Sequence, residues 1–90
     1  MAAVTREAVR GRLREFLLAE LIGNPRYPLR DDEPLISGGL IDSLALAQIL
    51  VFVENEFGVV MLDTDLTVEN MDTLELMTGK VLQTAGSGDA

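Results

Sequence analysis

Residues 42–58 read DSLALAQILVFVENEFG: an acid, a serine, a run of mostly apolar residues and a closing glycine. Within this run one apolar stripe recurs at helical spacing, formed by Leu46, Ile49, Leu50, Val53 and Phe57. Asp42 stands where a helix N-cap is required, and Gly58 is a typical residue just past a helix end. We therefore expect a helix from about Ser43 to Phe57, with its striped side facing a core.

The same helix carries apolar residues on a second side, at Leu44, Ala47 and Val51. A bundle of 90 residues is too small to enclose a helix all round, so part of this surface should stay exposed. Contiguous exposed apolar surface indicates a docking site. The alternative is that the long loop before the helix folds over these residues.

An amphipathic pattern also lies between Thr5, a suitable N-cap, and the helix-ending sequence Gly23-Asn24-Pro25. It predicts a first helix whose apolar stripe is Val9, Leu13, Phe16, Leu17 and Leu21. Residues 23–42 then contain all three prolines and no hydrophobic period, which predicts a long loop. The aliphatic residues expected to pack this loop along the helices are Leu29, Leu35, Ile36, Leu40 and Ile41. A disordered loop is the alternative.

After the central helix, residues 67–71 should form a single helical turn capped by its own first threonine. Asp72 or Thr73 can cap a last helix that continues to Leu82. Gly79 should weaken this helix by about 1 kcal/mol relative to alanine. The methionines expected to fill the core are Met61, Met71 and Met77.

These elements predict an all-α fold, a four-helix bundle with three main helices, one short helix and a long first loop. No segment alternates long enough to predict a strand. A single domain is expected over residues 1–84, followed by a flexible C-terminal tail over residues 85–90.

The composition excludes several classes of function. The chain has 15 acids against 7 bases, so a nucleic-acid or anionic membrane partner is not expected. It has no cysteine and no histidine, which removes thiolate metal sites, disulfides and the usual general base. The longest apolar stretch is too short for a membrane-spanning helix, which needs about 20 residues. We expect a cytoplasmic, monomeric protein without a metal site and without catalytic activity of its own.

Every charged residue from Asp31 to Gly79 is an acid. Acids gathered in one region of a protein steer basic partners and raise the association rate more than the final affinity. A merely solvated acidic surface is the alternative.

The sequence SGGLIDSL, residues 37–44, places Ser43 at the first turn of a helix directly after the long loop. A nucleophilic role requires a base, and the chain offers no histidine and only one lysine. Two other roles stay open. Ser43 could cap the helix, or it could accept a modification whose phosphate would face the positive end of the helix dipole. Asp42 could cap the helix and also meet a metal held by a modifying enzyme.

The motif Asp42-Ser43-Leu44, preceded by Gly39-Leu40 and followed by an apolar helix ending in ENEFG, resembles the acyl and peptidyl carrier proteins. The resemblance extends from about Val9 to Val81. It implies the carrier-protein type of helical bundle, with Ser43 esterified by 4′-phosphopantetheine and Asp42 and Leu44 supporting the motif. The chain would then be a discrete carrier that holds an acyl or aminoacyl group as a thioester on this arm.

The partners that the resemblance implies are a phosphopantetheinyl transferase, an acyl-loading enzyme and downstream synthase or tailoring enzymes. The loading enzyme would be an adenylate-forming ligase or an acyltransferase. The exposed side of the central helix is less acidic than in fatty-acid carriers, which favours specialised polyketide or nonribosomal-peptide biosynthesis. Residues expected to dock partners are Leu44, Ala47, Gln48, Val51 and Glu54. The alternative is a small acidic helical adaptor without a prosthetic group, in which Ser43 is only a cap.

Overall fold

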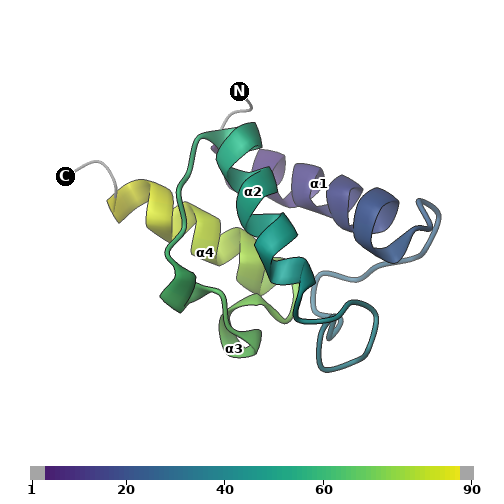
Figure 1. Cartoon of the computed structure of the whole chain (residues 1–90). Coiled ribbons are helices and arrows are strands. Elements are labelled where there is room, and N and C mark those ends of the chain that lie inside the picture. Colours follow the sequence, from purple (N-terminus) through teal and green to yellow (C-terminus); the bar gives the residue numbers. More distant parts are fainter. Residues whose placement is uncertain (1–3, 88–90) are drawn as a thin grey trace.

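The computed structural model describes residues 4–87, and for Ser87 the backbone alone. Over these residues all regular structure is helical (Figure 1), which confirms the all-α class. The helices are α1 Arg6–Phe16, η1 Leu17–Ile22, α2 Ala45–Phe57, η2 Asp63–Asp65, α3 Val68–Met71 and α4 Leu74–Ser87. Here η1 is a π-helical continuation of α1, and η2 is a single 3-10 turn.

The first helix begins and ends where its sequence predicts. The hydroxyl oxygen of Thr5 accepts the amide of Ala8 at 3.2 Å, and Gly23 ends the helical segment with a φ of 78°. The unexpected feature is the winding, because the last six residues form a π-helix. Within this wider turn, the consecutive residues Leu17 and Leu18 are both buried.

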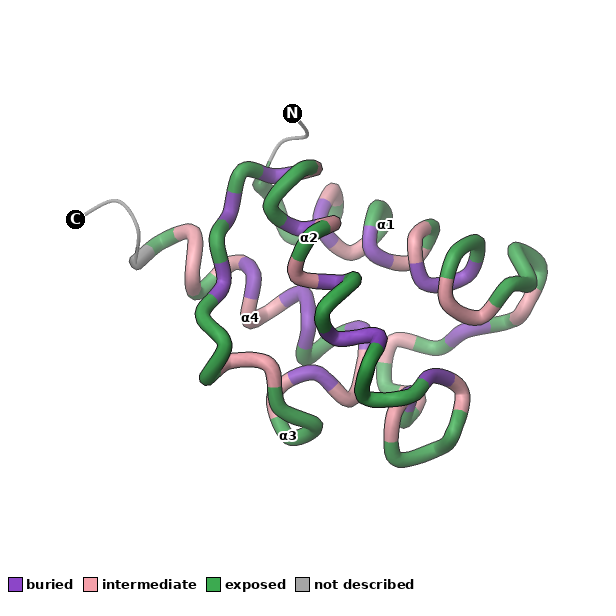
Figure 2. The backbone as a smooth tube through the Cα atoms, in the orientation of Figure 1, coloured by how far each residue is buried: buried purple, intermediate pink, exposed green. Residues whose placement is uncertain are grey.

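The core forms where apolar stripes from α1, α2 and α4 meet (Figure 2). It contains Val9, Leu13 and Leu17 from the first helical segment, Leu46, Ile49, Val53 and Phe57 from α2, and Leu74, Met77 and Val81 from α4. The three methionines expected in the core, Met61, Met71 and Met77, are all buried. Phe16, Leu21 and Leu50 differ from the expectation, since they lie at the edge of the core and are half-buried.

Residues 23–44 form the expected long loop without a helix or strand, and the loop is packed against the bundle. Leu29, Leu35 and Ile41 are buried, while Ile36 and Leu40 are half-buried against the core. Leu35 also anchors the main chain: its amide donates to the Asp72 carbonyl at 2.7 Å, and its carbonyl accepts the amides of Leu40 and Ile41. The alternative of a disordered loop is therefore wrong for this fold.

A carboxylate at the start of α4 holds the same loop. Asp72 Oδ1 accepts the amides of Ile36 and Ser37, each at 2.9 Å, and Oδ2 accepts the Ser37 hydroxyl at 2.6 Å. The cap of α4 is instead Thr73, whose hydroxyl oxygen accepts the amide of Leu76 at 3.0 Å. Of the two residues expected to cap α4, one therefore caps the helix and the other ties the loop to it.

The C-terminal helix continues past Leu82 to Ser87, so residues 85–87 are helical where a flexible tail was expected. Ala85 packs against the core, and the Thr84 hydroxyl donates to the Lys80 carbonyl at 2.9 Å. These contacts extend the helix beyond the last residue of the apolar stripe. Residues 1–3 of the expected domain and 88–90 of the expected tail lie outside the described residues.

The Asp72 contacts make the stability of the fold depend on pH. The hydrogen bond from the Ser37 hydroxyl, followed by the one from the Ser37 amide, lowers the pKa of Asp72 below its ordinary value of 3.8. Because the pKa is lowered in the folded state, the stabilisation is complete above the unfolded-state pKa and is lost as pH falls through the folded-state pKa.

We predict that Asp72→Asn lowers the melting temperature at pH 7 by about 4–8 °C, the shift caused by about 1 kcal/mol in a domain of this size. The difference from wild type should shrink as the pH of the measurement is lowered from 7 into the acidic range, because the stabilisation is lost as pH falls through the lowered folded-state pKa of Asp72. Asp63→Asn is the control, since Asp63 is exposed and its side chain makes no hydrogen bond to another described residue. A constant difference across this pH range would contradict the prediction.

Candidate functional site

The junction between the long loop and α2 is built by Asp42. Its Oδ1 accepts the amide of Ala45 at 3.2 Å, and its carbonyl accepts the same amide at 3.1 Å. Ser43 and Leu44 form a tight turn in which their carbonyls accept the amides of Leu46 and Ala47. The α-helix proper therefore begins at Ala45, two residues later than expected. Its N-cap position is Leu44, which makes no side-chain cap bond, so Asp42 caps the turn that leads into α2 rather than the helix itself.

Ser43 is exposed at the surface of this turn. Its hydroxyl makes no hydrogen bond to any residue that the structure describes. Ser43 is therefore not a side-chain cap of α2, and the side-chain hydrogen bond at this turn is accepted by its neighbour Asp42. Ser37, the other serine of the motif region, differs, since its hydroxyl is engaged by Asp72 at 2.6 Å.

A nucleophilic role for Ser43 has no support in its surroundings. The chain has no histidine, and its only lysine, Lys80, forms an ion pair with Asp65 at 3.3 Å. No other side chain of the described residues holds the Ser43 hydroxyl as a base would. What the geometry offers is an accessible hydroxyl at a fixed loop–helix junction, suited to modification by a separate enzyme.

The side of α2 that was expected to dock partners is exposed. The exposed fractions of Leu44 and Val51 are 78% and 53%, which are high values for aliphatic side chains. The other members, Ala47, Gln48 and Glu54, are exposed as well. The long loop therefore does not fold over this side of the helix, and the alternative that it does so is wrong.

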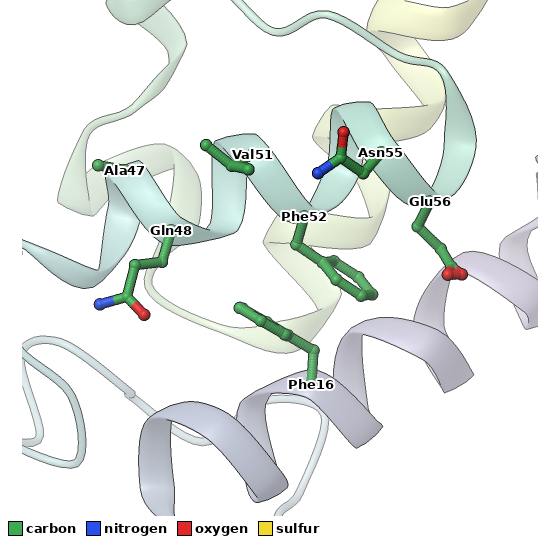
Figure 3. A pocket seen from close by; sticks show the side chains of 7 residues that line it. All are labelled: Phe16, Ala47, Gln48, Val51, Phe52, Asn55 and Glu56. Atoms are coloured by element: carbon green, nitrogen blue, oxygen red, sulfur yellow. The ribbon is translucent and has the colours of Figure 1, made fainter.

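A groove that the sequence did not reveal lies between α1 and α2 (Figure 3). We call it the α1–α2 groove; it has a volume of about 590 Å³ and is lined by Phe16, Ala47, Gln48, Val51, Phe52, Asn55 and Glu56. Phe16 projects from α1 onto Phe52, with ring centroids 4.3 Å apart and ring planes 15° from parallel. The ring of Phe52 also packs at nearly a right angle against the ring of the buried Phe57, with centroids 6.1 Å apart.

Some of the acids from Asp31 to Gly79, which we call the acidic block, are engaged in contacts within the fold. Asp31 pairs with Arg14 and with Arg10, Asp65 pairs with Lys80, and Glu33 accepts the Tyr27 hydroxyl. That hydrogen bond lowers the pKa of Glu33. Together with Asp72, these acids are therefore partly neutralised or hydrogen-bonded within the protein.

The acids that flank the exposed side of α2 are Asp42 at its start and Glu54 and Glu56 at its end. Only these three acids of the acidic block lie at the ends of α2, where their charge could act on a molecule that approaches this helix.

Three further findings concern metal binding, membrane-spanning helices and similarity to known proteins. Among the described residues, no group of three or more acidic, histidine or cysteine side chains could hold a metal ion. Within the same part of the chain, no helix is both long enough and apolar enough to cross a membrane. A scan against protein-family models and a search of curated proteins find no match for this chain.

We predict different effects on stability for the two neighbouring residues of the motif. Asp42→Ala should lower the free energy of unfolding by about 0.5–2 kcal/mol, because the cap of the turn is lost. Ser43→Ala should change it by less than about 0.5 kcal/mol, because no hydrogen bond within the described residues is removed. Urea denaturation of both variants measures the difference. A larger loss for Ser43→Ala would mean that its hydroxyl supports the fold.

Proposed function

We propose that this protein is a discrete carrier that holds an acyl or aminoacyl group on a 4′-phosphopantetheine arm attached to Ser43. The observation that carries the proposal is the Ser43 hydroxyl, which is exposed and unengaged within the described residues, in a turn already capped by Asp42. The Asp42-Ser43-Leu44 motif, which resembles that of the carrier proteins, stands at this turn. The arrangement of α1 to α4 around a long first loop is compatible with the carrier-protein bundle.

The residues at this junction fit the group. The attached phosphate would lie beside the N-terminal turn of α2, where the helix dipole favours negative charge. When bound, the group supplies a thiol, which a chain without cysteine lacks. The chain's own residues do the rest: the loop anchored by Asp72 holds the junction, and Asp42 keeps the turn folded while leaving the serine oxygen accessible.

The attachment step requires a separate enzyme. The Ser43 oxygen would attack the phosphorus atom of coenzyme A that bears the pantetheine, releasing 3′,5′-ADP, and its proton would pass to a base of the transferase. No described side chain is placed to accept that proton. Asp42 is exposed next to the serine and could meet a metal ion held by the transferase.

The partners that follow from this proposal are the transferase, a loading enzyme and downstream synthase or tailoring enzymes. They would approach the exposed side of α2, with Leu44, Ala47 and Val51 as the apolar centre and Gln48 and Glu54 beside them. This mainly neutral surface favours dedicated partners in polyketide or nonribosomal-peptide biosynthesis. The loading enzyme would be an adenylate-forming ligase or an acyltransferase.

Intact-mass measurement tests the attachment. After incubation with coenzyme A and a broad-specificity phosphopantetheinyl transferase, the wild-type protein should gain the mass of one arm. Ser43→Ala should abolish the gain, whereas the matched control Ser37→Ala should keep it. An adaptor without a prosthetic group would show no gain in any variant, and an arm mapped to Ser37 would contradict the proposed site.

We also predict that docking on α2 depends more on apolar contact than on charge. Burying a valine side chain contributes roughly 1.5–3 kcal/mol, whereas exposed ion pairs contribute about 0–1 kcal/mol. Val51→Asp should therefore weaken binding to the loading enzyme more than Glu54→Gln does, as measured by titration calorimetry. Because the Val51 side chain is 53% exposed, the melting temperature of the Val51→Asp variant should stay near that of wild type. The prediction would be refuted if Val51→Asp unfolded the protein, or if Glu54→Gln weakened binding to the loading enzyme more than Val51→Asp does.

A further inference from the structure

The chain between α2 and the η2 turn has one side on the core and the other side exposed. We call residues 58–62, with the sequence GVVML, the 58–62 segment. Val59 and Met61 are buried, whereas the exposed fractions of Val60 and Leu62 are 62% and 64%. Figure 2 shows this alternation where the chain leaves the end of α2. A period of two is that of a β-strand, and Leu62 has the extended backbone of a strand, with a φ of -83° and a ψ of 152°.

The main chain of this segment has no hydrogen-bond partner over most of its length. The amides of residues 59–62 and the carbonyls of residues 59–61 form no hydrogen bond with any residue that the structure describes. Only the last carbonyl, that of Leu62, is engaged, since it accepts the Asp65 amide at 2.9 Å. Backbone groups of this kind are normally paired in a folded protein. An extended segment that leaves them unpaired is a template for the addition of a second strand.

The sequence of the segment lacks the features that usually block strand addition. Exposed strand edges are protected by charged residues, above all lysine, or by proline, and the 58–62 segment contains none of these. Its two consecutive valines favour an extended backbone. Val59 and Met61 fix the segment from behind, because both belong to the core. A second strand would therefore meet a main chain that is already extended and held in place, which lowers the ordering cost of binding.

Acids at both ends of the segment determine which partner it can accept. Asp63 follows the segment directly, and Glu54 lies on the last turn of α2 before it. Both side chains are exposed, and neither forms an ion pair with a described residue. A second copy of this chain would bring the same acids and its own net charge of -8 to the contact, and like charges across paired strands are destabilising. A strand with a base at each end would be attracted instead.

We propose that the 58–62 segment is a docking edge for an extended segment of a partner protein, with apolar residues at alternate positions and a lysine or arginine at each end. The two segments pair as β-strands, so the partner's main chain satisfies the unbonded amides and carbonyls. Its apolar side chains lie beside Val60 and Leu62 on the outer face and cover them. The edge follows the end of α2 opposite to Ser43 (Figure 1), and the proposal does not depend on the carrier function.

The test titrates the isotope-labelled intact chain with two model peptides and follows the binding by nuclear magnetic resonance. One peptide has the sequence RTVTVTVR, and the other, ETVTVTVE, has the same interior with acidic ends. The basic peptide should shift the amide resonances of residues 59–62 and bind several-fold more tightly than the acidic peptide. Absence of binding, or equal affinities for the two peptides, would overturn the proposal.

Hydrogen exchange distinguishes strand pairing from other modes of binding. A strand directs the amides of alternate residues to the same neighbour. The basic peptide should therefore slow exchange at every second amide of the segment, either at Val59 and Met61 or at Val60 and Leu62. Resonance shifts without this alternating protection would overturn the proposal. Shifts that map instead to the exposed side of α2, at Leu44, would overturn it as well.

Two lysine variants make the comparison specific. Val60→Lys places a base in the middle of the segment, whereas Leu76→Lys makes the same change at an exposed apolar residue of α4. The first should weaken binding of the basic peptide several-fold, and the second should leave it nearly unchanged. Because both side chains are exposed, amide spectra of the free variants should show that each is folded. Equal losses in the two variants would mean that net charge alone controls binding, which would overturn the proposal.

The protein without peptide tests a second copy as the occupant. At millimolar concentration the wild-type chain should sediment as a monomer, and the amides of residues 59–62 should exchange without protection. Dimerisation that protects these amides would assign the edge to a second copy and overturn the proposal. No step of these experiments uses Ser43 or a prosthetic group, so failure here leaves the proposed carrier function standing.

Discussion

The carboxylate of Asp72 connects two parts of the chain that are far apart in sequence, and the position of Ser43 depends on that connection. Its two oxygens accept the amides of Ile36 and Ser37 and the hydroxyl of Ser37. The loop can turn so tightly between Pro34 and Gly38 because Gly38 lacks a side chain: a Cβ there would lie 2.2 Å from the Pro34 carbonyl oxygen. An irregular loop of this length thereby gains a defined course into the turn at Asp42.

The helices could be predicted from sequence because each one buries a stripe at helical spacing, as Leu46, Ile49 and Val53 do in α2. Their caps could be predicted where the bond is local, as at Thr5 and Asp42. The Asp72 contacts leave no such pattern, because their partners lie on a separate loop. The π-helical winding of η1 and the C-terminal end of α4 could not be predicted for a related reason. Both depend on tertiary packing, such as the contact of Ala85 with the core.

The candidate site shows the same division between local and tertiary information. Ser43 could be singled out because its motif is contiguous, and the exposure of Leu44 and Val51 followed from the small size of the bundle. The α1–α2 groove could not be predicted, because it requires Phe16 on one helix to meet Phe52 on another. The Phe16 position was expected within the core stripe, whereas its ring lies at the edge of the core and forms a surface.

Charge and apolar surface have separate roles around α2. Arg10 and Arg14 of α1 both pair with Asp31, so this acid links the loop to α1 and is less available to attract a partner. Acids at the two ends of α2 leave its middle neutral, where Ala47 and Val51 border the groove. Long-range charge can orient an approaching partner, and the residence time would then depend on apolar contact. Because Ala47 and Val51 line the groove and also belong to the proposed docking surface, a partner bound to this side of α2 would cover one wall of the groove.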